Sequence, residues 1–210
     1  MTKIVINGIS IDPERQAPAL ASANLTRGDS SASNYILIQT NQPLNREQKS
    51  ELANLSVTLL EYVPENTYIC YYSPADLSAI RALPFVVWAN IYLQGFKIPP
   101  TLSAGSSAAK VVNMLENLPM ARSMSQDTQK VEIVLHDNVS ANDIRDKIAA
   151  AAKLDPAELE VSNKKVKLVV QSRYLPDIAA IDEVRHIEAY VPKQLHNNIA
   201  LRILKADVSH

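Results

Sequence analysis

The sequence offers few side chains in a pattern that could do chemistry. Its four histidines are isolated, and none lies at metal-ligand spacing from another histidine, a cysteine or a pair of carboxylates. The single cysteine, Cys70, stands in an apolar run, where a free thiol usually behaves as a small buried hydrophobe. No Gly-x-Ser-x-Gly motif accompanies the serines. We therefore predict no catalytic residue, no metal site and no cofactor, and the chain by itself is not expected to be an enzyme.

Glycine and charge exclude further classes of function. The four glycines, Gly8, Gly28, Gly95 and Gly105, lie outside the apolar cores, so no strand–helix turn can cradle a phosphate or a small regulatory ligand. The net charge of −1 argues against a nucleic-acid partner, which would need a basic stripe. Without that stripe, Trp88 and the tyrosines are expected to pack in a core.

The chain has no apolar run long enough to be a signal peptide or to span a bilayer. This pattern predicts a protein without a membrane partner and with a cytoplasmic location. A secreted protein whose signal lies outside this sequence would look the same.

A stretch of 26 residues occurs twice, at Thr67–Tyr92 and at Lys165–Tyr190, with no gap between the aligned copies. The apolar positions coincide: Leu77, Ile80, Leu83 and Val86 fall on Leu175, Ile178, Ile181 and Val184. Only two copies exist, so a solenoid is excluded and two domains of one kind are expected.

Hydrophobic periodicity assigns the same order of elements to each copy. In the first, strands are expected at 35–39, 57–63, 67–72 and 85–93, with helices at 46–55 and 73–83. Asn45 with Gln48 predicts a capping box, and Ser73 with Pro74 predicts the second helix start. In the second, strands are expected at 131–135, 159–162, 166–170 and 184–191, with helices at 140–154, capped by Ser140, and 175–181.

The order βαββαβ in both copies predicts an α+β protein made of two tandem ferredoxin-like domains. Each would be a four-stranded antiparallel sheet with two helices on one face. The predicted divisions are an N-terminal extension at 1–33, domain 1 at 34–97, a linker at 98–129, domain 2 at 130–194 and a tail at 195–210. Asn7-Gly8 predicts a hairpin that could join a sheet edge, and further helices are expected near 110–118 and 195–203.

The two sheets are expected to differ on the face that is not covered by helices. Strands of the first copy are apolar on both sides, so its open face should be covered. In the second copy Val131, Ile133 and Leu135 alternate with Glu132, Val134 and His136, which predicts one dry and one largely wet face. His186 takes the position of Trp88 and is expected to pack or to lie at a sheet edge, whereas His196 should face solvent or a docking partner.

The repeats resemble the propeptide (inhibitor I9) domains of subtilisin-like serine proteases, in particular the N-terminal region of fungal members with two such domains in a row. The likeness lies in the short helix with Leu175, Ile178 and Ile181, followed by EVRHIEAY, and in NYILIQ, PLNREQKSEL and ALPFVVWANIY of the first copy. The tail LHNNIALRILKAD is similar to the segment that joins a second prodomain to its protease. Repeat 1 ends in LQGFKIPP and a linker, and catalytic motifs are absent.

The resemblance implies a pro-region that templates folding of a subtilisin-like catalytic domain, in cis or in trans, and then inhibits it. Its docking surface would be the second sheet, with Glu188 facing a helix N-terminus of the protease. The implied docking residues are Lys165, Lys167, Val169, Arg185, Ile187 and Glu188. The implied cleft-binding residues are Val191, Pro192, Lys193, Gln194 and Leu195. The alternative is a ferredoxin-like interaction or oligomerisation module without a protease partner, with a possible homodimer formed by the open sheet faces.

Overall fold

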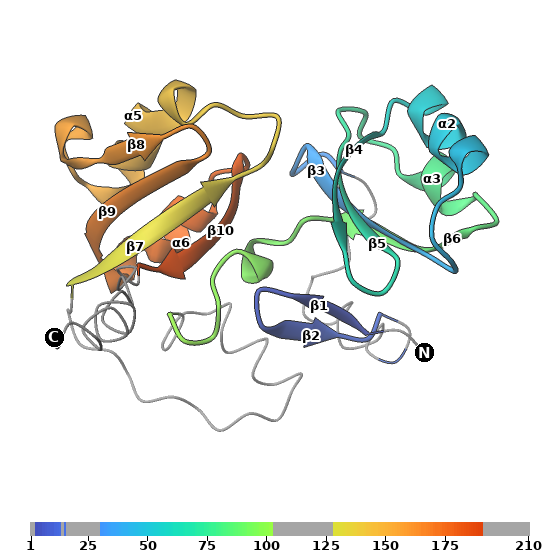
Figure 1. Cartoon of the computed structure of the whole chain (residues 1–210), viewed down its shortest axis with the longest axis horizontal. Helices are drawn as coiled ribbons and strands as arrows, with labels where there is room; N and C mark the ends of the chain where they lie inside the picture. Colours follow the sequence, from blue (N-terminus) through green and yellow to red (C-terminus); the bar gives the residue numbers. More distant parts are fainter. Residues whose placement is uncertain (1–2, 14, 16–29, 103–127, 191–210) are drawn as a thin grey trace, which may run out of the picture.

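The protein folds as two α+β units and a small N-terminal hairpin, as Figure 1 shows for the computed structural model. The structure describes residues 3–13, 15, 30–102 and 128–190. Each unit contains one four-stranded antiparallel sheet, which confirms the predicted class and the predicted number of strands per unit. No helix among these residues is long and apolar enough to cross a membrane.

The first unit follows the predicted order of elements. They are β3 (Tyr35–Thr40), α2 (Arg46–Asn54), β4 (Thr58–Val63), β5 (Thr67–Tyr71), α3 (Ser78–Arg81) and β6 (Val86–Ile91). The sheet order is β4-β5-β3-β6, so the first and third strands of the unit are central. The predicted capping box is confirmed, because the Asn45 side chain accepts from the Gln48 backbone amide while the Gln48 side chain accepts from that of Asn45.

The second unit repeats this arrangement with sheet order β10-β7-β9-β8. Its elements are β7 (Thr128–Leu135), α5 (Ala141–Ala152), η2 (Pro156–Glu158), β8 (Glu160–Ser162), β9 (Lys165–Gln171), η3 (Ser172–Tyr174), α6 (Leu175–Ala179) and β10 (Val184–Ala189). Again the first and third strands of the unit lie in the centre.

One predicted helix start is wrong, and at a second predicted start the serine side chain makes no cap. Helix α3 begins at Ser78 rather than after Ser73, because the carbonyls of Pro74 and Ala75 accept hydrogen bonds from Ser30 instead of starting a helix. Helix α5 does begin after Ser140, but the serine side chain does not cap it. The first amide of α5 donates instead to the backbone carbonyl of Asn163.

The N-terminal hairpin covers the second face of the first sheet. Strands β1 (Ile4–Ile6) and β2 (Ile9–Ile11) pair around Asn7-Gly8, whose positive φ angles of 52° and 79° fit the turn signal. Their inward isoleucines form one buried cluster with Tyr35, Leu37, Val63, Ile69, Ile91, Tyr92, Leu93 and Phe96. The predicted cover is confirmed. The suggested place is wrong, since the hairpin is a separate two-stranded sheet that packs on the face rather than extending an edge.

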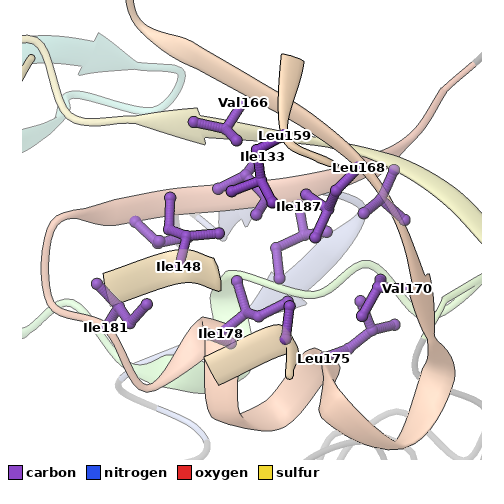
Figure 2. Packing of buried hydrophobic residues seen from close by; sticks show 14 of the residues in the cluster. Ile133, Ile148, Leu159, Val166, Leu168, Val170, Leu175, Ile178, Ile181 and Ile187 are labelled. Atoms are coloured by element: carbon purple, nitrogen blue, oxygen red, sulfur yellow. The ribbon is translucent and has the colours of Figure 1, made fainter. Parts of the chain in front are cut away.

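Each unit has its own core between sheet and helices. In the first unit this core includes Leu52 of α2, Ile80 of α3 and Cys70 of β5, all fully buried. Burial raises the pKa of the Cys70 thiol, which is consistent with an unreactive core residue. Figure 2 shows the second core, where Ile148 and Ile178 of the helices meet Ile133 and Ile187 of the sheet.

The start of the predicted linker packs with the second unit. After β6 the chain forms η1 (Gln94–Phe96), and Ile98 and Leu102 are then buried in the core of the second unit. In Figure 1 this green segment passes from the first unit to the second. Strand β7 already begins at Thr128. The predicted helices near 110–118 and 195–203, His196 and the whole predicted tail at 195–210 lie outside the described residues.

Candidate functional site

The first candidate surface is the second-sheet outer face, which is the side of that sheet opposite α5 and α6. Strand register aligns its side chains in rows across β10, β7, β9 and β8. The central row is Glu188, Glu132, Lys167 and Glu160; the rows beside it are His186, Val134, Lys165 and Ser162, and Tyr190, Lys130 and Val169. The face therefore carries alternating charges with exposed apolar groups beside them.

Ion pairs neutralise most of this charge within the face. Glu132 and Glu188 are direct neighbours across β7 and β10, an arrangement that would be repulsive alone. The Lys165 ammonium pairs with Glu132 and lies 3.6 Å from a Glu188 carboxylate oxygen. Lys167 adds a contact of 3.7 Å to Glu132, and Lys130 one of 3.3 Å to Glu160.

The pairing has an electrostatic consequence for the central carboxylate. Partial burial acts to raise the pKa of Glu132, but the lysine ammonium groups outweigh burial and hold that pKa below its ordinary value. The hydrogen bond to Glu132 in turn raises the pKa of Lys165. Glu188 is the more exposed carboxylate of the pair, with 47% of its side chain accessible. It can therefore accept a further donor from a partner at little cost in desolvation.

Four of the six predicted docking residues lie on this face, and two do not. Lys165, Lys167, Val169 and Glu188 point outward, and Val169 is 53% exposed. The prediction that Ile187 is a docking residue is wrong, because its side chain is fully buried in the core below the sheet. A β-bulge between Val184 and His186 turns Ile187 inward. Arg185, at the bulge, pairs with Glu61 of the first unit instead of lying on the outer face.

The predicted cleft-binding segment, Val191–Leu195, lies outside the described residues. Its starting point is nevertheless defined, because the Tyr190 amide donates to the Lys130 carbonyl at 3.0 Å. The ammonium groups of Lys130 and Lys167 lie 4.5 and 4.9 Å from the centre of the Tyr190 ring. The chain thus leaves β10 beside the second-sheet outer face.

The second candidate is the junction between the units. Here the first unit supplies Ser33, Tyr35, Tyr92, Gln94 and Lys97, and the second supplies His136, Asn138, Asp182 and Arg185. The Ile187 amide donates to the Lys97 carbonyl at 2.7 Å, so the segment after η1 pairs with the outer edge of β10. An otherwise unpaired strand edge is thereby occupied from within the chain.

His136 lies at the centre of this junction. Its ring stacks on Tyr35 with centroids 3.7 Å apart and meets Tyr92 edge-on at 5.3 Å. The residue is 1% exposed, and Nε2 has no hydrogen-bond partner among the described residues. Burial, with the nearby Lys97 and Arg185 cations, lowers the pKa of His136 to about 2. The expectation of a wet His136 is therefore wrong.

Asp182 is the main polar contact from the second unit to the first. Its carboxylate accepts from the Ser33 hydroxyl at 2.5 Å and from the Asn34 amide at 2.9 Å. On the same side, the hydroxyl of Tyr35 donates to Asn138 Oδ1 at 3.0 Å. The Tyr92 hydroxyl donates to the Arg185 carbonyl at 2.9 Å. Hydrogen bonds from the residues around the start of β3 and the end of β6 thus surround the stacked rings.

Lys97 is a buried cation at the same junction. It is 3% exposed, and its ammonium donates to the carbonyls of Ile181 at 2.8 Å and Asp182 at 3.3 Å. Burial lowers the pKa of Lys97 to about 8, although the carboxylates of Asp182 and Glu183 oppose the shift. The folded protein therefore holds this proton less tightly than the unfolded chain does.

This shift predicts a pH-dependent stability. A lysine whose pKa falls from 10.5 to about 8 on folding reduces stability as the pH decreases through that window. Between pH 7.5 and 9.5 the wild type should gain about 2 kcal/mol relative to Lys97→Met, which cannot titrate. Urea unfolding of both proteins at the two pH values measures this difference. Equal changes with pH in the two proteins would contradict the prediction.

Within the described ranges no group of three or more His, Cys, Asp or Glu residues could hold a metal ion. His186 lies partly buried on the second-sheet outer face, 3.6 Å from Glu188, in a packing position as predicted. No local sequence pattern points to Lys97 or Asp182, because both lie in connections and acquire these partners across the junction.

Comparison with known proteins names no function. Residues 5–93 match a family model described as "Domain of unknown function (DUF8729)". The match begins within β1 and ends at Leu93, so it spans the hairpin and the first unit up to that residue. No curated protein matches, and no solved structure matches.

Proposed function

We propose that this chain is the non-catalytic pro-region of a subtilisin-like serine protease, which it helps to fold and then inhibits. We further infer that both units are ferredoxin-like folds, since each places its strands in the order fourth, first, third, second. The chain's resemblance to tandem propeptide domains supports this function, and the two units have different roles in it.

The observation that carries the proposal is the second-sheet outer face. Its side chains remain half-exposed, and Tyr190, the residue before the predicted cleft-binding segment, lies beside it with its amide bonded to the Lys130 carbonyl. A protease can therefore be bound in two places, by the face on its surface and by the following segment in its cleft. Binding at two linked places raises affinity through effective concentration.

The chemistry of the face fits the surface helices of a protease. Val134 and Val169 supply apolar area, and Glu188 supplies a carboxylate for the positive end of a helix dipole. Lys165 remains beside Glu188 and keeps the carboxylate in position before binding.

The first unit cannot bind in the same way. Its equivalent sheet face is buried under the hairpin, and the chain after its last strand is held at the junction by Lys97. We therefore assign it a scaffolding role, in which it occupies the outer edge of β10 and fixes the last strand before the cleft-binding segment.

Inhibition kinetics with the purified chain test this function. We expect nanomolar inhibition of a subtilisin-type protease, as for other protease–inhibitor pairs, and none of a trypsin-type enzyme. Val169→Asp should weaken inhibition at least tenfold, because it places a carboxylate in the apolar part of the docking face. Val87→Asp is the matched control, since Val87 is 46% exposed on a strand of the other unit.

Two outcomes would contradict the proposal. One is the absence of both inhibition and assisted refolding with subtilisin-type enzymes. The other is equal loss of inhibition in both aspartate variants, which would remove the second-sheet outer face from the mechanism. A stable dimer disrupted by Val169→Asp would instead favour the interaction or oligomerisation module.

A further inference from the structure

We propose that the junction between the two units is opened by acid, and that protonation of His136 separates the units while each stays folded. This inference concerns the chain alone and does not depend on a protease partner. It rests on the position of the His136 imidazole at the contact between the two units.

The burial of His136 depends on the first unit. The residue follows β7 of the second unit, whereas the rings against it, Tyr35 and Tyr92, come from β3 and the end of β6. A face-to-face stack at 3.7 Å with rings inclined by 9° excludes water from one side of the imidazole. When the units separate, both tyrosine rings move away from the imidazole, which then contacts water.

In the closed form, the groups that face His136 disfavour its protonation. From the first unit these groups are the Lys97 ammonium and the two tyrosine hydroxyls; from β10 they are Arg185 and His186. The nearby carboxylates are engaged elsewhere. Asp182 accepts from Ser33 and Asn34, Glu183 pairs with Lys147, and Glu61 pairs with Arg185. Protonated His136 would thus lie among cations, with no described acceptor at Nε2.

The direction of the pH effect follows from the two states. Above pH 6.5 the imidazole is neutral in both forms, and the equilibrium between them does not depend on it. Below pH 6.5 only the open form binds the proton, because burial lowers the pKa of His136 to about 2 in the closed form. Each pH unit in this window shifts the equilibrium about tenfold towards the open form, so pH 4.5 shifts it about a hundredfold.

The units can part without unfolding because their buried residues form separate clusters, with partly buried Val139 packing against both. The second unit has its own buried cluster, which includes Ile98 and Leu102 from the connecting segment. The first unit has its helix-side core and the cluster under the hairpin, which ends at Phe96. The crossing point at Lys97 lies between these clusters. The two bodies therefore remain tethered there when the contacts around His136 are lost.

Fluorescence energy transfer in the full chain tests the opening. Dyes on Glu47→Cys in α2 and Arg145→Cys in α5 report the separation of the units, while buried Cys70 stays unlabelled. We expect transfer to fall between pH 6.5 and 4.5 with an unchanged far-ultraviolet circular dichroism spectrum. His136→Phe keeps the ring stack and His136→Gln keeps a polar group, and neither can titrate, so both should keep transfer high at pH 4.5.

His186→Gln is the comparison variant, because it removes the neighbouring histidine, which contacts Arg185 at 2.9 Å, and leaves the stack of His136 on Tyr35 intact. This variant should therefore still open between pH 6.5 and 4.5. The proposal is overturned if the wild type keeps its transfer efficiency down to pH 4. It is also overturned if the His136 variants open like the wild type, or if circular dichroism is lost together with transfer.

Discussion

Replacement of Ile4 and Ile9 together by alanine should destabilise the first unit by about 4–10 kcal/mol. Both side chains are almost fully buried under the first sheet, at 0% and 1% exposure. Each loss of a buried isoleucine costs about 2–5 kcal/mol in transfer free energy and cavity formation. A domain of this size is stable by about 5–15 kcal/mol, so the double variant should be near its unfolding midpoint at room temperature.

Trp88 provides the readout for this variant. It is the only tryptophan of the chain and packs at the edge of the hairpin cluster, so its emission should shift to the red when the cover is lost. Val5→Ala is the control, since Val5 lies in the same strand with 47% exposure. If the double variant and Val5→Ala had the same denaturation midpoint, the hairpin would not be part of the first core.

Ile187→Ala should cost the second unit about 2–5 kcal/mol, because Ile187 is fully buried. Figure 2 shows its side chain among those of the second core, next to the strand residues Ile133 and Leu168. The cavity would open between the sheet and α6, where neighbouring groups come from different elements and cannot all move together. Chemical denaturation monitored by circular dichroism measures the loss.

The neighbouring Glu188→Ala is the matched control for position and secondary structure. It should change stability by less than about 1 kcal/mol, because its ion pairs lie on a half-exposed face. The two variants should rank the other way in protease inhibition. Measured where both are folded, Glu188→Ala should weaken inhibition more than Ile187→Ala does. Equal stability of the two variants would contradict the inward turn of Ile187 at the bulge.

Sequence reasoning succeeded where local interactions decide the outcome. The capping box of Asn45 and Gln48 needs only three residues of spacing, and the structure forms it as predicted. The hairpin at Asn7-Gly8 depends on two residues that accept positive φ angles. All eight strands of the two units also appear, since alternation and β-branched residues describe strands well within one segment.

Sequence reasoning failed at β10, where one extra residue shifts the alternation of inward and outward side chains. Uninterrupted alternation from Val184 places Arg185 and Ile187 on the same face of β10. The bulge before His186 inserts a residue, which sends Ile187 into the core and leaves Arg185 at the junction. A bulge depends on the register with the partner strand β7, which no pattern within β10 contains.

The sequence by itself determined the duplicated βαββαβ order, the charged outer face of the second sheet and the need for a cover over the first. Only the tertiary structure decided what provides that cover and where the units meet. By sequence, His136, Lys97 and Asp182 are ordinary polar residues of loops and strand ends. They become partners at the junction through contacts with residues 84 to 149 positions away. Such contacts depend on how two finished units pack, which local propensity and periodicity do not encode.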